Sequence, residues 1–343
     1  MLASILFSLT TFLWAMNFNH GETSSLLSAL YDNYGMQQRL ETRVAEMARE
    51  AGKNFLPLRA AARPEDSIAT SHLPAARDKA SLLPTRSTST DYKLAVDSGV
   101  AIDCNSGTVL YQKNGDLVKP IASLTKLMTA LVFLEYNPGW ERTYQIREED
   151  RREGSKAYLA VGEKVKIKDL FYLSLVASGN TETVALVNAT GLGLDNFVKK
   201  MNDKANELGL VNTIFRDPVG LDNGNVSTAL EVAKLAQAAF ALNDIRQASI
   251  TKKHEFTTLA GNKIVVDNTD KLLEEFSSSP QIKIIGGKTG YTDEAGGCLT
   301  SQFVNQSGKE IISVVLGGAD RSSRFSETKG LVEWAYQNYR WPE

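Results

Sequence analysis

The sequence predicts an α+β fold, in which an antiparallel sheet is flanked by helices and a helical lobe is inserted into the sheet. Strand-like runs open the globular part between residues 93 and 113, and they return between residues 263 and 316. Four helical segments fill the interval, at residues 168–177, 181–190, 193–208 and 228–242. The sheet therefore has to be assembled from both ends of the globular part.

The globular part is expected to span residues 92–343. Its first two strands, 93–103 and 108–113, are joined by the turn sequence Asn105-Ser106-Gly107, which predicts a hairpin. A helix follows at 120–135, and then come charged turns and short strands from 144 to 168. After the four helices, strands are expected at 263–266, 282–285, 299–304 and 310–316, followed by a closing helix at 326–339.

Residues 1–20 are interpreted as a signal peptide or an N-terminal membrane anchor. The run 2–16 is apolar and uncharged, but about 15 residues reach only roughly 22 Å, which suits a signal peptide better than a full membrane span. No Lys or Arg precedes this run and no clear A-x-A site follows it, so an uncleaved anchor, a misplaced start codon and a buried helix remain alternatives. Export is the expected consequence.

Residues 21–91 are expected to hold a helical segment and a flexible linker. The pattern of 23–51 is that of a polar amphipathic helix, and its role cannot be read from the sequence. Residues 57–90 are rich in Ala, Ser, Thr, Pro and charge, with little periodic apolar content, which is typical of a tether. A tether of this kind would let the globular part work away from a membrane surface.

The composition excludes two broad classes of function. The 38 basic residues nearly balance the 40 acidic ones, so no overall field attracts nucleic acid. The two cysteines lie far apart, and the histidines are scattered without ligand spacing, so we expect no metal site and no cofactor. Cys104 and Cys298 are expected to be small buried thiols, with one disulfide as the alternative.

The helix at 120–135 carries the first candidate for chemistry. Ser123 and Lys126 are three residues apart, so they lie about one turn from each other on the same side. Serine is a weak nucleophile that needs a nearby base, and a lysine can be that base once it has lost its proton. One face of this helix is expected to be buried through leucines at helical spacing: Leu124, Leu127, Leu131 and Leu134.

An isolated S-x-x-K is weak evidence, because a surface serine and lysine on an ordinary helix give the same pattern. The chain contains the motif three times, at Ser123, Ser249 and Ser326. Only the first precedes both of the other two motifs described next. Ser123 is therefore distinguished from the other two serines by the motifs that follow it in the chain.

Ser178-Gly179-Asn180 is the only S-x-N in the chain, and it interrupts apolar helical sequence. The serine could relay a proton, and the asparagine offers a carbonyl oxygen and two N–H donors. The plainer interpretation is a helix C-cap with Gly179 in the turn.

Lys288-Thr289-Gly290 is the only K-T-G, and it follows a strand-like run. A lysine beside a threonine hydroxyl can bind a carboxylate, and the glycine lets a substrate backbone approach. The same letters resemble the end of a phosphate-binding P-loop, but that motif needs a glycine where this chain has Ile282.

These three motifs, in this order, are the combination found in penicillin-binding proteins and class A β-lactamases. From Tyr92 to Tyr339 the chain resembles the D-alanyl-D-alanine carboxypeptidases, the low-molecular-mass penicillin-binding proteins of serine peptidase family S11. The sequence is similar to that of the family around ASLTKLMTA, SGN, MNDKANELGLVNTIFRDPVGLDN and GGKTGYTDEAGGCL. The resemblance implies a β-lactamase/transpeptidase-like fold. It also implies an acyl-serine peptidase that removes the terminal D-alanine from peptidoglycan stem peptides and is acylated by β-lactams.

The resemblance also implies roles for individual residues. Ser123 would be the nucleophile, Lys126 its base, Ser178 the proton relay to the leaving amine and Asn180 a group that orients the substrate. The remaining candidates would bind the substrate: Lys288, Thr289, Gly290, Tyr291 and Arg324. Among these, Lys288, Thr289 and Arg324 would bind the carboxylate. The oxyanion would lie between the backbone N–H groups of Ser123 and Tyr291.

These roles require that Lys126 can lose its proton at neutral pH. We expect a lowered Lys126 pKa because Lys288 brings a second cation nearby, and we expect the helix start to favour negative charge at Ser123. Lys126 should therefore be substantially neutral in the folded protein.

Three other functions stay open at this stage. A β-lactamase would share the three motifs. The class A β-lactamase motif E-x-x-L-N is absent, however, and the corresponding stretch of this chain reads FRDPVGLDN, which argues for a peptidase. A D,D-endopeptidase would use the same chemistry on cross-links, and a non-catalytic wall-binding protein would keep only the fold. Because the chain ends at Glu343, without the β-rich domain and C-terminal anchor of many family members, membrane attachment is expected through the N-terminus, outside the cytoplasm.

Overall fold

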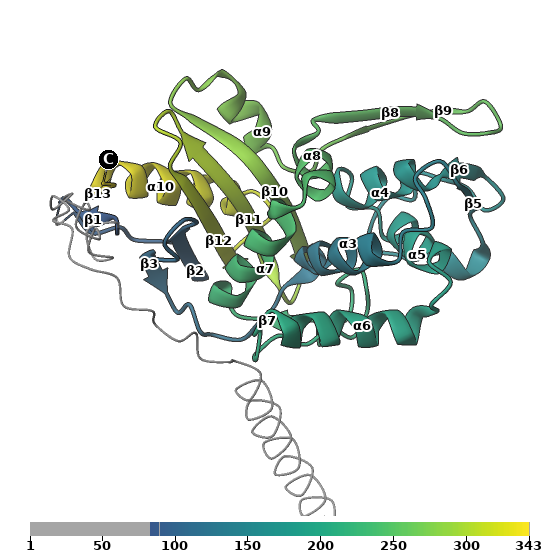
Figure 1. Ribbon diagram of the computed structural model, residues 1–343, viewed down its shortest axis with the longest axis horizontal. Coiled ribbons are helices and arrows are strands. Elements are labelled where there is room, and N and C mark those ends of the chain that lie inside the picture. The colour runs from purple at the N-terminus through teal and green to yellow at the C-terminus, as the bar shows by residue number, and fades with distance from the viewer. Residues whose placement is uncertain (1–82, 89, 343) are drawn as a thin grey trace, which may run out of the picture. The chain divides into compact units, whose positions relative to one another are not determined.

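The computed structural model describes residues 83–88 and 90–342 (Figure 1). The expected signal peptide or anchor, the helical segment and nearly all of the tether lie outside these residues. Within the described ranges, none of the helices combines the length and the apolar character needed to cross a membrane.

A five-stranded antiparallel sheet forms the centre of the fold, as the sequence predicts. Its strand order is β10-β11-β12-β2-β3. The strands span β2 (Val96–Asp103), β3 (Val109–Lys113), β10 (Ile282–Thr292), β11 (Gly296–Asn305) and β12 (Glu310–Gly318). The first two form the predicted hairpin, with Ala101 opposite Tyr111. Strands from the two ends of the chain meet where β12 pairs with β2.

Side chains alternate between the two faces of the sheet and reach two separate parts of the core. In β12, Ile311 and Val315 belong to the core cluster that includes Leu331 and Trp334 of α10 (Ser323–Asn338). The intervening Ile312 and Val314 belong to the cluster that includes the helical lobe. Helix α10 therefore covers one face and α7 (Ala229–Ala241) covers the other, because each face is apolar.

The helical lobe enters the chain between β3 and β10, as predicted. It contains α3 (Thr125–Glu135), α4 (Ile167–Leu175), α5 (Asn180–Ala189) and α6 (Leu194–Glu207), and the α8 helix (Asn243–Ile250) leads back toward the sheet. The lobe also carries a short hairpin of β5 (Thr143–Gln145) and β6 (Lys164–Lys166).

The strand predicted at 263–266 has a different place from the one expected. It is β9 (Lys263–Asp267), and it pairs with β8 (Lys253–Thr257) in a separate hairpin beside the lobe (Figure 1). The α8 helix was not predicted. The hairpin stays outside the central sheet because one face of its strands packs on the lobe, where His254 stacks on Tyr172 of α4.

The prediction that α3 buries only one face is wrong. Every residue from Thr125 to Phe133 is buried. The reason is position, because α3 contacts α4, α5, α6, α7 and α8 at once. A helix surrounded in this way buries its polar residues too, which has consequences for Lys126.

Smaller elements join these parts. Strand β1 (Thr85–Arg86) pairs with β13 (Tyr339–Arg340), and β4 (Lys119–Pro120) pairs with β7 (Val226–Ser227). A short α9 (Leu272–Glu275) precedes β10. Both cysteines are free thiols, with Cys298 buried and Cys104 half-buried.

Candidate active site

Ser123 lies in a tight turn immediately before α3. The turn is the 3₁₀ segment Ala122–Leu124, so the α-helix begins two residues later than the nucleophile rather than at it. Ala122 adopts φ of 46°, a left-handed conformation that is unusual for a residue with a side chain. Gly220 packs directly on this turn, because a Cβ at Gly220 would lie 1.9 Å from the Ala122 carbonyl oxygen. The packing presents Ser123, which is half-buried, to a cavity.

Lys126 is fully buried beneath Ser123 and donates three hydrogen bonds. Its Nζ lies 2.9 Å from Ser123 Oγ, 2.8 Å from Asn180 Oδ1 and 2.7 Å from the Val219 carbonyl oxygen. The last two atoms can only accept, so they take two of the N–H bonds. When Lys126 is neutral, its lone pair is therefore left facing the Ser123 hydroxyl.

Burial lowers the pKa of Lys126 from 10.5 to about 7, while the negative charges of Asp217 and Glu182 act in the opposite direction. The predicted direction is thus confirmed, but the predicted cause is not the main one. The cation–cation effect falls instead on Lys288. Burial first, and then the positive charges of Lys126 and Arg324, lower the pKa of Lys288 well below its ordinary value.

Ser178 and Asn180 lie at the junction of α4 and α5, where the chain turns between the two helices. The Gly179 N–H bonds to the Leu173 carbonyl oxygen across the end of α4. The left-handed residue of the turn is Ser178 itself, with φ of 57°, rather than Gly179. This conformation leaves Ser178 half-exposed at the cavity, while Asn180 is buried with its Oδ1 on Lys126.

The K-T-G residues lie within β10, which runs further than predicted, to Thr292. The Lys288 Nζ donates to Ser178 Oγ at 2.8 Å and to the Thr289 carbonyl oxygen at 2.9 Å. The Thr289 hydroxyl pairs with that of Thr269 at 2.7 Å. The S-x-N motif therefore bonds to both of the other motifs, because Asn180 accepts from Lys126 and Ser178 accepts from Lys288.

Arg324 reaches the same place from α10. Its Nη1 donates to the Gly290 carbonyl oxygen at 2.6 Å, and its buried Nε has no partner among the described residues. The Tyr291 ring lies beneath the guanidinium of Arg321, 4.0 Å from its centroid. Behind β10, burial raises the pKa of Asp270 to about 6, against the opposing effect of Arg324 and Lys288. Positive charge therefore dominates this end of the site.

A cavity of about 170 Å³ unites these residues. Its lining includes seven of the nine predicted site residues: Ser123, Ser178, Asn180, Thr289, Gly290, Tyr291 and Arg324. Lys126 and Lys288 lie behind the lining and reach it through the two serines.

Several residues of the site were missed by the sequence analysis. Thr269, Gly220 and Arg321 line the cavity, and Val219 accepts from Lys126. One signal was available, because Asp-Pro-Val-Gly is typical of a turn in which an Asp side chain binds following N–H groups. Asp217 does so, accepting from the N–H groups of Val219 and Gly220 at 2.6 Å.

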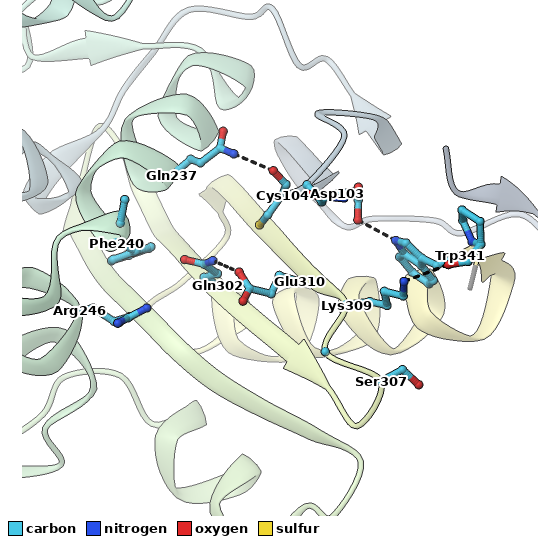
Figure 2. Close-up of a pocket in the computed structure, with 14 residues that line it drawn as sticks. Asp103, Cys104, Gln237, Phe240, Arg246, Gln302, Ser307, Lys309, Glu310 and Trp341 are labelled. Carbon is cyan, nitrogen blue, oxygen red and sulfur yellow. Dashed lines mark hydrogen bonds between the residues drawn. The ribbon is translucent and has the colours of Figure 1, made fainter. Parts of the chain in front are cut away.

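A larger cavity, of about 670 Å³, lies at another end of the sheet and does not contain the motif residues (Figure 2). Several of its polar side chains already bond within the protein. Gln302 donates to Glu310 at 2.6 Å, Trp341 donates to Asp103 at 2.6 Å, and Gln237 donates to the Cys104 carbonyl oxygen at 2.8 Å. Size alone therefore does not locate the reactive groups of this fold.

The fold is that of the DD-transpeptidases. The crystal structure of the Streptomyces K15 DD-transpeptidase matches with a TM-score of 0.67 and 29% sequence identity, covering 72% of this chain and 99% of that one. The family model described as D-alanyl-D-alanine carboxypeptidase matches residues 85–320. The chain belongs to this peptidase family.

Curated relatives carry two kinds of name. The chain is 34% identical over 246 residues to a D-alanyl-D-alanine endopeptidase of Pseudomonas aeruginosa, covering 71% of this chain and 77% of that protein. It is 32% identical over 248 residues to the D-alanyl-D-alanine carboxypeptidase DacF of Bacillus subtilis, covering 71% of this chain. The match spans 62% of the length of DacF.

Proposed function

We propose that this protein is a serine-type D-Ala-D-Ala carboxypeptidase that removes the terminal D-alanine from peptidoglycan stem peptides and is acylated by β-lactams. The observation that carries this proposal is the environment of Lys126. Two hydrogen-bond partners of Lys126 Nζ can only accept hydrogen bonds, and the third partner is Ser123 Oγ. The pKa of Lys126 is about 7. This arrangement suits a neutral amine that accepts the serine proton.

In the proposed acylation, Ser123 Oγ attacks the carbonyl carbon of the penultimate D-alanine as its proton passes to neutral Lys126. The backbone N–H groups of Ser123 and Tyr291 stabilise the oxyanion. As the C–N bond breaks, Ser178 gives its proton to the leaving amine of D-alanine and regains one from Lys288, to which it is hydrogen-bonded. Water then attacks the ester, Lys126 returns its proton to Ser123, and the proton of water restores Lys288 through Ser178.

The proposed site for the substrate carboxylate lies at the positively charged end of the cavity. Thr289 offers a hydroxyl and Arg324 contributes positive charge, while Lys288 lies behind the lining and would act on the carboxylate from there. Gly290 packs beside the Ser123 backbone, and Asn180 is linked to Ser123 through Lys126, so these two residues would orient the penultimate residue. The terminal carboxylate would thus determine which peptide bond reaches Ser123.

The test is the intact mass of the full chain mixed with benzylpenicillin, followed by mapping of the modified peptide. A persistent adduct on Ser123, absent in Ser123→Ala, supports the proposal when D-alanine is also released from a pentapeptide. A short-lived adduct with consumption of penicillin would favour a β-lactamase. The absence of both adduct and consumption would contradict the proposal and favour a non-catalytic wall-binding protein.

A D,D-endopeptidase is the second candidate, because relatives that match about three quarters of their length carry that name. The same acyl-serine chemistry would act on a cross-linked dimer, with an amine of the second stem as the leaving group. Comparing release of D-alanine from a pentapeptide with cleavage of a cross-linked dimer distinguishes the two activities. We further propose an extracytoplasmic location, a peptidase domain at 92–343, and export or anchoring through residues 1–20.

A further inference from the structure

The cavity of about 670 Å³ in Figure 2 lies away from the motif residues and has no part in the proposed chemistry. Gln302 of β11, in its lining, pairs with Gly286, two residues before Lys288 in β10, so the same two strands reach from this cavity to the active site. The Cys104 thiol in the lining stays protonated at neutral pH, because burial raises its pKa to about 12. The cavity therefore suits binding rather than reaction.

The C-terminal residues form one wall of this cavity. The Trp341 Nε1 donates to Asp103 Oδ1 at 2.6 Å, and the Lys309 Nζ donates to the Pro342 carbonyl oxygen at 3.0 Å (Figure 2). The ring of Trp341, which is half-buried, also lies 5.6 Å from the Tyr336 ring between centroids. These contacts hold an aromatic ring and a proline ring at the cavity without help from a ligand, which lowers the entropic cost of binding one.

Three side chains on the other side of the cavity lie close together: Phe240, Arg246 and Gln302 (Figure 2). Gln302 is 8% exposed, and its Nε2 donates to Glu310 Oε2 at 2.6 Å. This bond fixes the amide and leaves its Oε1, on the side of Phe240 and Arg246, as an acceptor. The Phe240 ring is held by the β10 backbone, where a Cβ at Gly286 would lie 2.5 Å from Phe240 Cγ.

Arg246 is the member of this group with spare bonding capacity. In the part of the chain that the structure describes, Arg246 forms no salt bridge, and its guanidinium makes one long hydrogen bond, from Nη2 to Asn243 Oδ1 at 3.4 Å. The side chain is half-buried, and a guanidinium carries several N–H donors. Arg246 can therefore donate to a ligand without giving up a strong internal contact.

The charges of the lining balance one another. The carboxylates of Asp103 and Glu310 are matched by the cations of Arg246 and Lys309, so no net field collects a polyanion here. A neutral ligand with many polar groups fits better. An acetamido group has a carbonyl oxygen that needs a donor, an N–H that needs an acceptor and a methyl group that needs an apolar contact. The guanidinium, the glutamine oxygen and the phenyl ring of the three-residue group supply these in turn.

We propose that this cavity binds a glycan of N-acetylated amino sugars. Arg246 donates to the acetamido carbonyl oxygen, Gln302 Oε1 accepts from its N–H, and Phe240 contacts its methyl group. The Trp341 ring packs on the apolar face of an adjoining sugar. The choice of peptidoglycan as the natural ligand rests on the proposed function, because its stem peptides are carried on a strand of such sugars. Binding the strand here raises the local concentration of its stems at the active site.

The binding test is calorimetry on the full chain with the tetrasaccharide of N-acetylglucosamine. Cellotetraose has hydroxyls in place of the acetamido groups and should bind at least about tenfold more weakly. Arg246→Ala removes only one long internal bond, so it should fold normally and weaken binding of the N-acetylated sugar about tenfold. Arg142→Ala, at an exposed arginine outside the lining, is the matched control and should leave binding unchanged. Absence of binding, equal affinity for the two sugars or equal losses in the two variants would overturn the proposal.

The consequence for activity is tested with two substrates, a soluble pentapeptide and insoluble peptidoglycan rich in pentapeptide stems. Arg246→Ala should slow D-alanine release from the insoluble substrate by about fivefold or more, because the local concentration of stems falls. Its kcat/KM on the soluble pentapeptide and its acylation by benzylpenicillin should stay within about twofold of the unmodified chain. An unchanged rate on the insoluble substrate, or an equal loss on both substrates, would overturn the inference.

The proposed function and this inference fail in different ways. Rapid acylation by benzylpenicillin in a chain that does not bind the N-acetylated sugar would overturn the inference alone. Sugar binding that depends on Arg246, in a chain that penicillin does not acylate, would support the glycan cavity and contradict the peptidase activity.

Discussion

The pKa of Lys126 makes a quantitative prediction about the rate of acylation. With a pKa of about 7, roughly half of the protein molecules carry a neutral Lys126 at pH 7. With the ordinary value of 10.5, only about 1 in 3,000 would do so. Acylation by benzylpenicillin should therefore rise with pH to a midpoint near 7 and then level off.

The assay is the pseudo-first-order rate of adduct formation at Ser123, followed by intact mass between about pH 5.5 and 9.5. Spontaneous hydrolysis of the penicillin is measured in parallel without protein. Lys126→Arg is the control, because a guanidinium stays protonated throughout this range, and it should not show the rise. A rate that keeps increasing tenfold per pH unit from pH 7.5 to 9.5 would refute the assignment of Lys126 as a neutral base.

The same shift predicts a dependence of stability on pH. The pKa of Lys126 is lower in the folded chain than in the unfolded chain, so between about pH 7 and 10.5 the unfolded chain binds more protons. The contribution of this group to the free energy of unfolding must therefore rise with pH over that window, and it is lost as the pH falls through 7. Lys126→Met should remove this slope, as measured by urea unfolding at several pH values.

Three further substitutions test the packing and proton transfers around this lysine. Gly220→Ala should slow acylation by at least about a hundredfold, because its Cβ would overlap the Ala122 carbonyl oxygen. The control is Gly261→Ala, which has a similar φ and open space, and it should cost only about 1 kcal/mol of stability and leave acylation unchanged. Equal effects in the two variants would contradict the claim that packing of Gly220 on the turn positions Ser123. Ser178→Ala should reduce D-alanine release by about 10² to 10⁴ with little change in Tm, and an unchanged rate would exclude Ser178 as the relay. Glu182→Gln should move the acidic limb of the acylation profile to lower pH, since the carboxylate raises the pKa of Lys126, and a move to higher pH would contradict that assignment.

Much of this protein is determined by short-range sequence pattern. The alternation of β2 and β3 with a turn between them, the helical periodicity of the lobe and the apolar runs of β11 and β12 all reflect local geometry, so these elements form where the sequence predicts them. The three-residue spacing of Ser123 and Lys126 likewise brings their side chains together, although the turn is 3₁₀ at the serine rather than α-helical. The order of the three motifs indicated penicillin-binding proteins or class A β-lactamases, and the similar sequence around the motifs indicated the family.

Only the tertiary structure decided how these parts act together. The burial that lowers the pKa of Lys126 comes from helices packed all around α3, which periodicity in α3 alone does not reveal. The Val219 carbonyl oxygen, 93 residues along the chain, completes the arrangement of acceptors around that amine. The separate β8–β9 hairpin and the cavity shared by Arg246 and Gln302 have the same origin. Local pattern specifies neighbours within a turn or a strand pair, whereas contacts between distant segments depend on how complete elements pack.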